Sequence, residues 1–107
     1  MNSVKRIEIL NNIGNFFQGV IQWRESITSD GEANVVKHLH YAEALIQLLE
    51  VEDCGSVGGF DKNQPTPKTL FDRWDWLFHK YDNPKGKRFG CGIVSYGDIR
   101  KFFRRKG

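Results

Sequence analysis

Hydrophobic residues recur every three or four positions over most of the chain, a spacing that predicts helices. From about Ser3 to Ile27, two apolar rows run side by side and predict one long helix whose wide apolar face contacts two neighbours. Gly14 and Gly19 interrupt this helix, so we expect a kink or the close approach of another helix there. A turn over Ser29–Gly31 leads to a second helix, from about Glu32 to Glu50, and the two predict an antiparallel helical hairpin.

The second helix has an apolar side and a polar side. Its inward positions are predicted to be Val35, Leu39, Ala42, Ile46 and Leu49, and its outward positions Lys37, His40, Glu43, Gln47 and Glu50. The stretch from Cys54 to Pro65 is rich in glycine and polar residues and predicts a loop.

The third predicted helix, Thr66–Tyr81, carries the strongest aromatic pattern. Thr66 suits the N-cap and Pro67 the first helical position, because the threonine hydroxyl accepts a hydrogen bond and proline has no N–H group to leave unpaired. Six large apolar side chains share one face: Leu70, Phe71, Trp74, Leu77, Phe78 and Tyr81. We therefore expect this face to be buried and the other elements to pack around it.

The polar side of the third helix holds the first candidate site. Trp76 points away from the aromatic face, so it either flanks a second packing surface or is available to a partner. Asp72 and Asp75 precede His79 by seven and four residues and resemble a carboxylate–imidazole pair that moves a proton. The interpretation that we favour for this group is ordinary ion pairing on a solvent-exposed helix face.

The last part of the chain predicts a short extended segment and a terminal helix. The extended segment runs from Arg88 to Val94 and is weakened by Gly90 and Gly92. Ser95 and Asp98 approximate a capping box at the start of the helix. Within the helix, Ile99, Phe102 and Phe103 are expected to face the core, and Arg100, Lys101, Arg104, Arg105 and Lys106 to face water.

Taken together, these elements predict a mainly α, compact single helical domain over residues 1–107. Hydrophobic residues at 39% and charged residues at 27% are typical of an ordinary folded domain rather than of a disordered chain. The two cysteines, Cys54 and Cys91, do not make a disulfide framework. No segment has the apolar region of a leader peptide or the length of a bilayer span, so we expect a cytoplasmic protein with no membrane partner.

Charge is distributed unevenly along the chain. Residues 1–83 hold 8 Lys and Arg against 12 Asp and Glu, a net charge of −4, whereas residues 84–107 hold 8 against 1, a net charge of +7. A basic segment of this kind can attract a phosphate backbone, an acidic protein or membrane surface, or the acidic first part of its own chain. The cations that would contact nucleic acid are Lys85, Lys87, Arg88, Arg100, Lys101, Arg104, Arg105 and Lys106. No helix-turn-helix, RRM or zinc-finger signature accompanies them.

The segment His38-Leu39-His40, with Tyr96 downstream, resembles the metal-binding motif and nucleophile of rolling-circle replication endonucleases. The resemblance implies a metal-dependent nuclease, but it covers only these few residues. In that family the two histidines alternate on a strand, whereas here the segment is predicted to be helical, where residues two apart diverge by about 200°. The lysine expected three residues after the tyrosine is Ile99 in this chain.

Other candidate chemistry is sparse. No CxxC, CxxH or HxxxH spacing supports a zinc site, and the glycine-rich run Gly55–Gly59 lacks the GK[ST] ending of a phosphate-binding loop. Cys91 has no basic partner near it in the sequence that would make it a nucleophile. We therefore predict no catalytic residue, no metal and no cofactor.

The function that we expect is binding to another protein. A small non-enzymatic protein with charged faces and few free aromatic side chains suits an inhibitor, such as a bacterial immunity protein that neutralises a toxin, for example a nuclease, or a phage-encoded inhibitor. The residues expected to bind the partner are Trp76, Asp72, Asp75, Arg100, Arg104 and Arg105. The alternatives are a nucleic-acid-binding protein that uses the basic terminal helix and the metal-dependent nuclease, and the sequence leaves the partner, the binding face, the oligomeric state and the source organism open.

Overall fold

Four helices and one two-stranded hairpin make up the part of the chain that the computed structural model describes, residues 2–24, 30–54, 67–81, 86, 88–90, 92 and 94–104. The elements are α1 (Ser3–Arg24), α2 (Gly31–Cys54), α3 (Pro67–Lys80), β1 (Arg88–Phe89), β2 (Val94–Ser95) and α4 (Tyr96–Phe103). The mainly α fold predicted from the sequence is confirmed. None of the helices described is long and apolar enough to cross a membrane.

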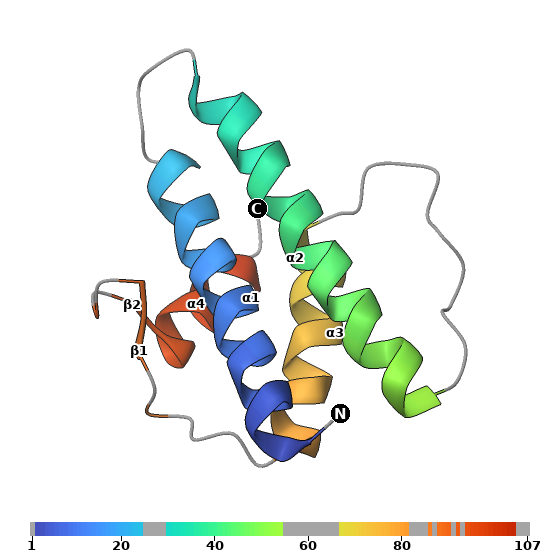
Figure 1. Cartoon of the computed structure of the whole chain (residues 1–107). Coiled ribbons are helices and arrows are strands. Elements are labelled where there is room, and N and C mark those ends of the chain that lie inside the picture. The colour runs from blue at the N-terminus through green and yellow to red at the C-terminus, as the bar shows by residue number, and fades with distance from the viewer. Residues whose placement is uncertain are drawn as a thin grey trace.

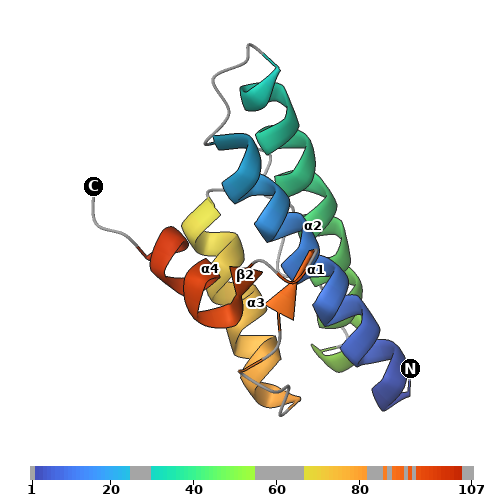
Figure 2. The same cartoon turned by 90° about the vertical axis from the view of Figure 1, so that its left-hand side faces the viewer.

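The helices form two layers. α1 and α2 lie side by side and run antiparallel, as the predicted helical hairpin requires, and α3 and α4 pack behind them (Figure 1). The view turned by 90° separates the layer of α1 and α2 from the layer of α3 and α4 (Figure 2). The apolar face of α1 is therefore covered on more than one side, because it contacts α2, α3, α4 and β1.

Trp74 of α3 lies at the centre of the core. Its side chain is fully buried, and its indole Nε1–H donates a hydrogen bond of 3.0 Å to the backbone oxygen of Leu10 in α1. This bond matters because a buried donor without a partner costs about 1–3 kcal/mol. The ring is surrounded by the rings of Phe17, Phe71, Phe78, Phe89 and Tyr96, with centroids 5.1–5.8 Å away. The prediction that the aromatic face of α3 organises the fold is thus confirmed.

Two glycines let other elements approach α1 closely. A Cβ atom added to Gly19 would lie 2.4 Å from Cδ2 of His38 in α2, and one added to Gly14 would lie 2.4 Å from Cδ1 of Phe89 in β1. The close approach predicted at these positions is confirmed. At Gly14, however, the neighbour is a ring from the hairpin rather than another helix.

The extended segment predicted from Arg88 to Val94 is not continuous: it is divided into two short strands, Arg88–Phe89 and Val94–Ser95. β1 and β2 pair antiparallel, with Arg88 opposite Ser95 and Phe89 opposite Val94. Gly90 and Gly92 have φ values of +66° and +82°, which other residues rarely adopt, and they allow the chain to reverse here. The Gly90 N–H also donates to Asn15 Oδ1 at 2.8 Å, so the turn is attached to α1.

α4 begins at the predicted capping box. Ser95 is the N-cap: its Oγ accepts a hydrogen bond from the Asp98 N–H, and the Asp98 carboxylate accepts one from the Ser95 N–H. Ile99 and Phe103 are buried, as predicted. Phe102 is only partly buried, and the Arg24 guanidinium lies 5.6 Å from its ring centroid.

Several details of the predicted helices need correction. α2 extends to Cys54 rather than ending at Glu50. Glu43, predicted to face solvent, is only 7% exposed, and its Oε1 lies 3.9 Å from His40 Nδ1 one turn earlier on the helix. Tyr81 is half-buried just after α3, with the Arg6 guanidinium 5.2 Å from its ring centroid. The predictions for Ile27, Ser29, Thr66 and the loop after Cys54 fall outside the described residues.

Candidate partner-binding surface

α3 exposes Trp76 on the side opposite the core. The buried side chains of the helix are Leu70, Phe71, Trp74, Leu77 and Phe78. Trp76, in contrast, is 57% exposed. Of the two alternatives for this tryptophan, the structure contradicts a second packing surface within the described chain. The Lys80 Nζ atom lies 4.9 Å from the ring centroid, a cation–π contact that leaves the indole on the surface.

Charged side chains surround this tryptophan. On a helix, the neighbours of Trp76 are the residues three and four positions away, Asp72, Arg73, His79 and Lys80. We call these four residues together with Trp76 the Trp76 surface. Arg73 also contacts α2: its Nε lies 2.8 Å from Glu50 Oε1 and its Nη2 lies 2.9 Å from Oε2, a bidentate pair that fixes α3 against α2.

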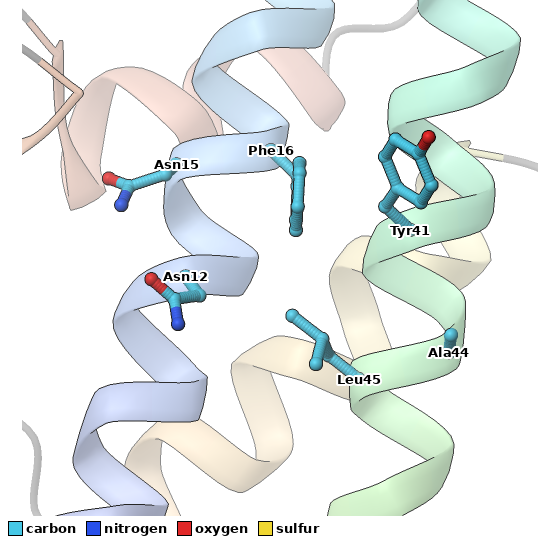
Figure 3. Close-up of a pocket in the computed structure, with 6 residues that line it drawn as sticks. All are labelled: Asn12, Asn15, Phe16, Tyr41, Ala44 and Leu45. Carbon is cyan, nitrogen blue, oxygen red and sulfur yellow. The ribbon is translucent and has the colours of Figure 1, made fainter.

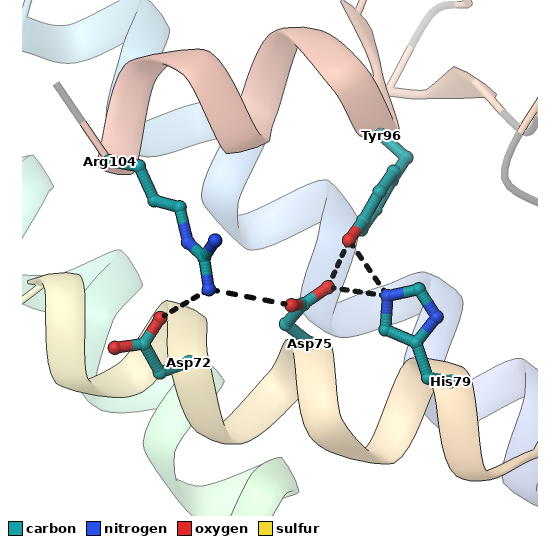
Figure 4. A network of polar contacts seen from close by, with 5 residues as sticks. All are labelled: Asp72, Asp75, His79, Tyr96 and Arg104. Carbon is teal, nitrogen blue, oxygen red and sulfur yellow. Dashed lines mark hydrogen bonds and ion pairs between the residues drawn. The ribbon is translucent and has the colours of Figure 1, made fainter.

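A polar network joins α3 to α4 beside the Trp76 surface (Figure 4). The Tyr96 hydroxyl donates a hydrogen bond to Asp75 Oδ1, and His79 Nε2 lies 3.2 Å from both Asp75 Oδ1 and Tyr96 Oη. Because the single hydroxyl proton goes to Asp75, the contact between His79 and Tyr96 requires the histidine Nε2–H as its donor. The predicted pairing of Asp75 with His79 is confirmed. The solvent-exposed setting favoured for the pair holds for His79, whose side chain is 45% exposed, but not for Asp75, which is 15% exposed and also accepts a hydrogen bond from Tyr96 of α4.

Tyr96 is chemically perturbed by this position. Burial, followed by the hydrogen bond to the Asp75 carboxylate and the charge of that group, raises the pKa of Tyr96 to about 12. The hydroxyl therefore stays protonated at neutral pH and acts as a hydrogen-bond donor. The Tyr96 ring is 5% exposed and stacks on Phe78, with centroids 4.7 Å apart.

Arg104 contacts the chain's own carboxylates. Its Nη2 lies 3.5 Å from Asp72 Oδ1 and 4.0 Å from Asp75 Oδ2, and its guanidinium carbon lies 5.9 Å from the Phe71 ring centroid. This cation from the basic segment thus docks on the acidic first part of the chain, one of the alternatives that the sequence left open. The side chains of Asp72 and Arg104 remain 47% and 45% exposed and can still meet a partner.

The other predicted binding cations are more dispersed. Arg100 and Lys101 are exposed on α4, and Arg88 is exposed on β1, where its Nη1 donates to the Gly92 oxygen at 3.0 Å. Hydrogen bonds from Ser95, reinforced by the charges of Lys101 and Arg88, lower the pKa of Asp98. The remaining predicted cations lie outside the described residues: Lys85, Lys87, Arg105 and Lys106.

The histidines of the endonuclease-like motif lie on α2 as predicted for a helix. His38 packs on α1, where its ring centroid is 5.9 Å from that of Phe16 and its Nδ1 is 2.7 Å from the Asn34 oxygen, while His40 is exposed. Tyr96 packs on α3 instead. In the described part of the chain, no group of three or more His, Cys, Asp and Glu side chains is arranged to hold a metal ion. Cys91 and the side chain of Cys54 lie outside that part.

A pocket on the α1–α2 layer was not predicted. Its volume is about 630 Å³, and it is lined by Asn12, Asn15, Phe16, Tyr41, Ala44 and Leu45 (Figure 3). A signal for it exists in the sequence: Tyr41, Ala44, Leu48 and Val51 form a second apolar row on α2, in addition to the row that faces the core.

No protein-family model matches the chain, and neither a curated protein nor a solved structure is significantly similar to it. Its function is therefore inferred from its own residues.

Proposed function

We propose that this chain is a small, non-enzymatic cytoplasmic protein that binds and blocks a protein partner, in the manner of toxin-neutralising immunity proteins or phage-encoded inhibitors. The observation that carries the proposal is the exposure of Trp76 on a helix whose other large aromatic side chains are buried. Tryptophan is among the residues most enriched at the energetic centres of protein interfaces. In the proposed interface Trp76 is the central aromatic contact, and the charged side chains around it form the polar rim.

The rigidity of α3 supports this role. The helix is fixed to the core by its apolar face, to α2 by the pair of Arg73 with Glu50, and to α4 by the bond between Asp75 and Tyr96. A side chain presented by an element that is already ordered loses little conformational entropy on binding, so more of the contact energy appears as affinity.

Charges of both signs surround the tryptophan and give the surface a means of selecting its partner. Asp72 and Arg104 are each about half exposed at its edge. Exposed charges at the edge of an interface mainly set the association rate and the orientation of the partner, whereas the central aromatic side chain sets the dissociation rate. In this mechanism the protein covers the active site of its partner, and a nuclease toxin, with a basic substrate groove, is one class that the exposed Asp72 carboxylate would attract.

The proposal is tested by capturing the partner from the native host with three forms of the protein. The wild type and a Val4→Ala control, which shortens an exposed apolar side chain on α1, are expected to capture the same protein and to inhibit its activity at stoichiometric amounts. Trp76→Ala is expected to weaken binding about 30-fold or more, the effect of losing about 2 kcal/mol at an interface centre.

The fold of the variant serves as the internal check. Because Trp76 is largely exposed, Trp76→Ala should change the free energy of unfolding by no more than about 1 kcal/mol, the size of its cation–π contact with Lys80. Partner binding that survives Trp76→Ala would refute the role of this surface. Capture of nucleic acid and no protein would refute the proposed function, and loss of that capture in Arg100→Glu with Arg104→Glu would favour the nucleic-acid-binding alternative.

A further inference from the structure

α2 carries two apolar rows on opposite sides. The inner row, Val35, Leu39, Ala42, Ile46 and Leu49, is buried in the core. The outer row consists of Tyr41, Ala44, Leu48 and Val51, spaced three, four and three residues apart. Tyr41, Leu48 and Val51 are 45%, 44% and 44% exposed, and they are three of the five large hydrophobic residues exposed in the described part of the chain.

The spacing of the outer row is that of a helix-pairing face. Apolar residues that alternate every three and four positions over two heptads form the line along which one helix packs on another. The row spans eleven residues, and its first and last members lie about 15 Å apart along the helix. The pocket that Phe16, Tyr41, Ala44 and Leu45 line lies directly beside the row, so this face is both apolar and hollowed (Figure 3).

The charges at the two ends of the outer row are opposite. Lys37 stands four residues before Tyr41 and continues the row at its N-terminal end, whereas Glu52 follows Val51 at its C-terminal end. Both are exposed. Between them, the pocket is lined only by apolar and amide side chains. Two copies of this face placed antiparallel would bring the Lys37 end of one toward the Glu52 end of the other, within about one helical turn, whereas a parallel arrangement in register would oppose like charges.

The sizes of the side chains also match in the antiparallel arrangement. A two-fold axis at the level of Ile46 pairs positions whose numbers lie equally far on either side of it. Tyr41 then meets Val51 of the second copy, and Ala44 meets Leu48 of the second copy. The large leucine thus faces the small alanine that lines the pocket, and each contact occurs twice.

We propose that the outer row of α2 is a homodimer interface, at which a second copy of this chain packs antiparallel with Leu48 inserted against Ala44 and its pocket. The occupant is a second copy because the face is complementary to itself in charge and in side-chain size. This interface is independent of the proposed binding function, since Trp76 lies on α3 in the other layer.

Analytical ultracentrifugation of the full chain over a series of concentrations tests the dimer. The wild type is expected to shift from a mass of 12.4 kDa toward twice that value as its concentration rises. Leu48→Glu, which places a charge in the contact, should stay monomeric with an unchanged helical circular dichroism spectrum. The matched control Val4→Glu places the same charge on an exposed apolar position of α1, outside the row, and should still dimerise.

The orientation is tested by disulfide trapping in a background with Cys54→Ser and Cys91→Ser. Under oxidation, a mixture of the Ala44→Cys and Leu48→Cys variants should form a covalent heterodimer, while neither variant alone should cross-link. A chain that is monomeric at every concentration, or a dimer that Leu48→Glu leaves intact, would overturn the proposal. Cross-linking of Ala44→Cys with itself would overturn the proposed register, because a two-fold axis at the level of Ile46 does not place the two Ala44 positions opposite each other.

Discussion

Replacing Gly14 of α1 by alanine tests how closely the hairpin of β1 and β2 packs on that helix. The added methyl carbon would lie 2.4 Å from both Cδ1 and Cε1 of Phe89 and 2.9 Å from Cγ. Because carbon atoms in contact are about 3.5–4.0 Å apart, the ring must move by about 1 Å. It has little room to do so, since Phe89 is 1% exposed and its centroid lies 5.7 Å from that of Trp74.

The magnitude follows from two opposing effects. Overpacking a closed core costs about 1–3 kcal/mol, whereas alanine in a helix interior is about 1 kcal/mol more favourable than glycine. With three ring atoms inside contact distance and the ring held by Trp74, the cost should be at the upper end, so we expect Gly14→Ala to lower the free energy of unfolding by about 2 kcal/mol. For a chain of this size, the melting temperature should fall by about 8 °C.

Chemical denaturation of a glycine series gives the measurement. The matched control is Gly97→Ala in the first turn of α4, where the nearest atom to the added carbon is Ser95 Oγ at 3.8 Å, and this change should stabilise the protein by about 0.5–1 kcal/mol. In a Phe89→Leu background, Gly14→Ala should cost at least about 1 kcal/mol less. If Gly14→Ala and Gly97→Ala changed the free energy of unfolding in the same direction, the packing of Phe89 against α1 would be refuted.

Two further predictions concern α4. Ser95→Ala removes the N-cap and should lower the free energy of unfolding by about 1 kcal/mol, as measured in thermal melts. In the same variant, NMR titration should show the pKa of Asp98 rising toward its ordinary value of 3.8, because the hydrogen bonds from Ser95 weaken. The pKa of Tyr96 is raised in the folded state, so its stabilising contribution is present below pH 10 and is lost as the pH rises toward about 12. Denaturation curves across this range should show that loss in the wild type and a smaller one in Tyr96→Phe, and equal pH dependence of the two proteins would contradict the Asp75 contact.

The helices could be predicted because their periodicity is local. Leu70, Trp74 and Phe78 share a helix face whatever surrounds them. Because these large apolar side chains must be buried, the helix has to turn this face toward the core. The same reasoning misread Gly90 and Gly92 as a weakness within one strand. Their positive φ values show that glycine here permits a reversal of the chain, and composition alone does not distinguish these two uses of glycine.

The site depended on contacts that no local pattern records. Asp75 and Tyr96 are 21 residues apart in the sequence, and they meet only because α4 docks along α3 after the hairpin reverses the chain. The exposure of Trp76 likewise depends on how the other elements pack, because the sequence of α3 alone does not show whether another element covers its outer side. The outer row of α2 was visible in the sequence, but the inner row already accounted for the helix, so Leu48 and Val51 were not assigned to a surface.

The two proposed interfaces can be separated experimentally because they belong to different layers. Trp76 extends from α3 and the outer row from α2, and each helix turns its opposite side to the shared core. Trp76→Ala should therefore leave the mass of the dimer unchanged, and Leu48→Glu should leave the affinity of a single site for the partner unchanged. A dimer would, however, carry two Trp76 surfaces, so it should hold a partner immobilised at high density longer than the Leu48→Glu monomer does, by avidity alone. Equal residence times of the two forms, with dimerisation established, would mean that the second Trp76 surface cannot reach a partner while the first is bound.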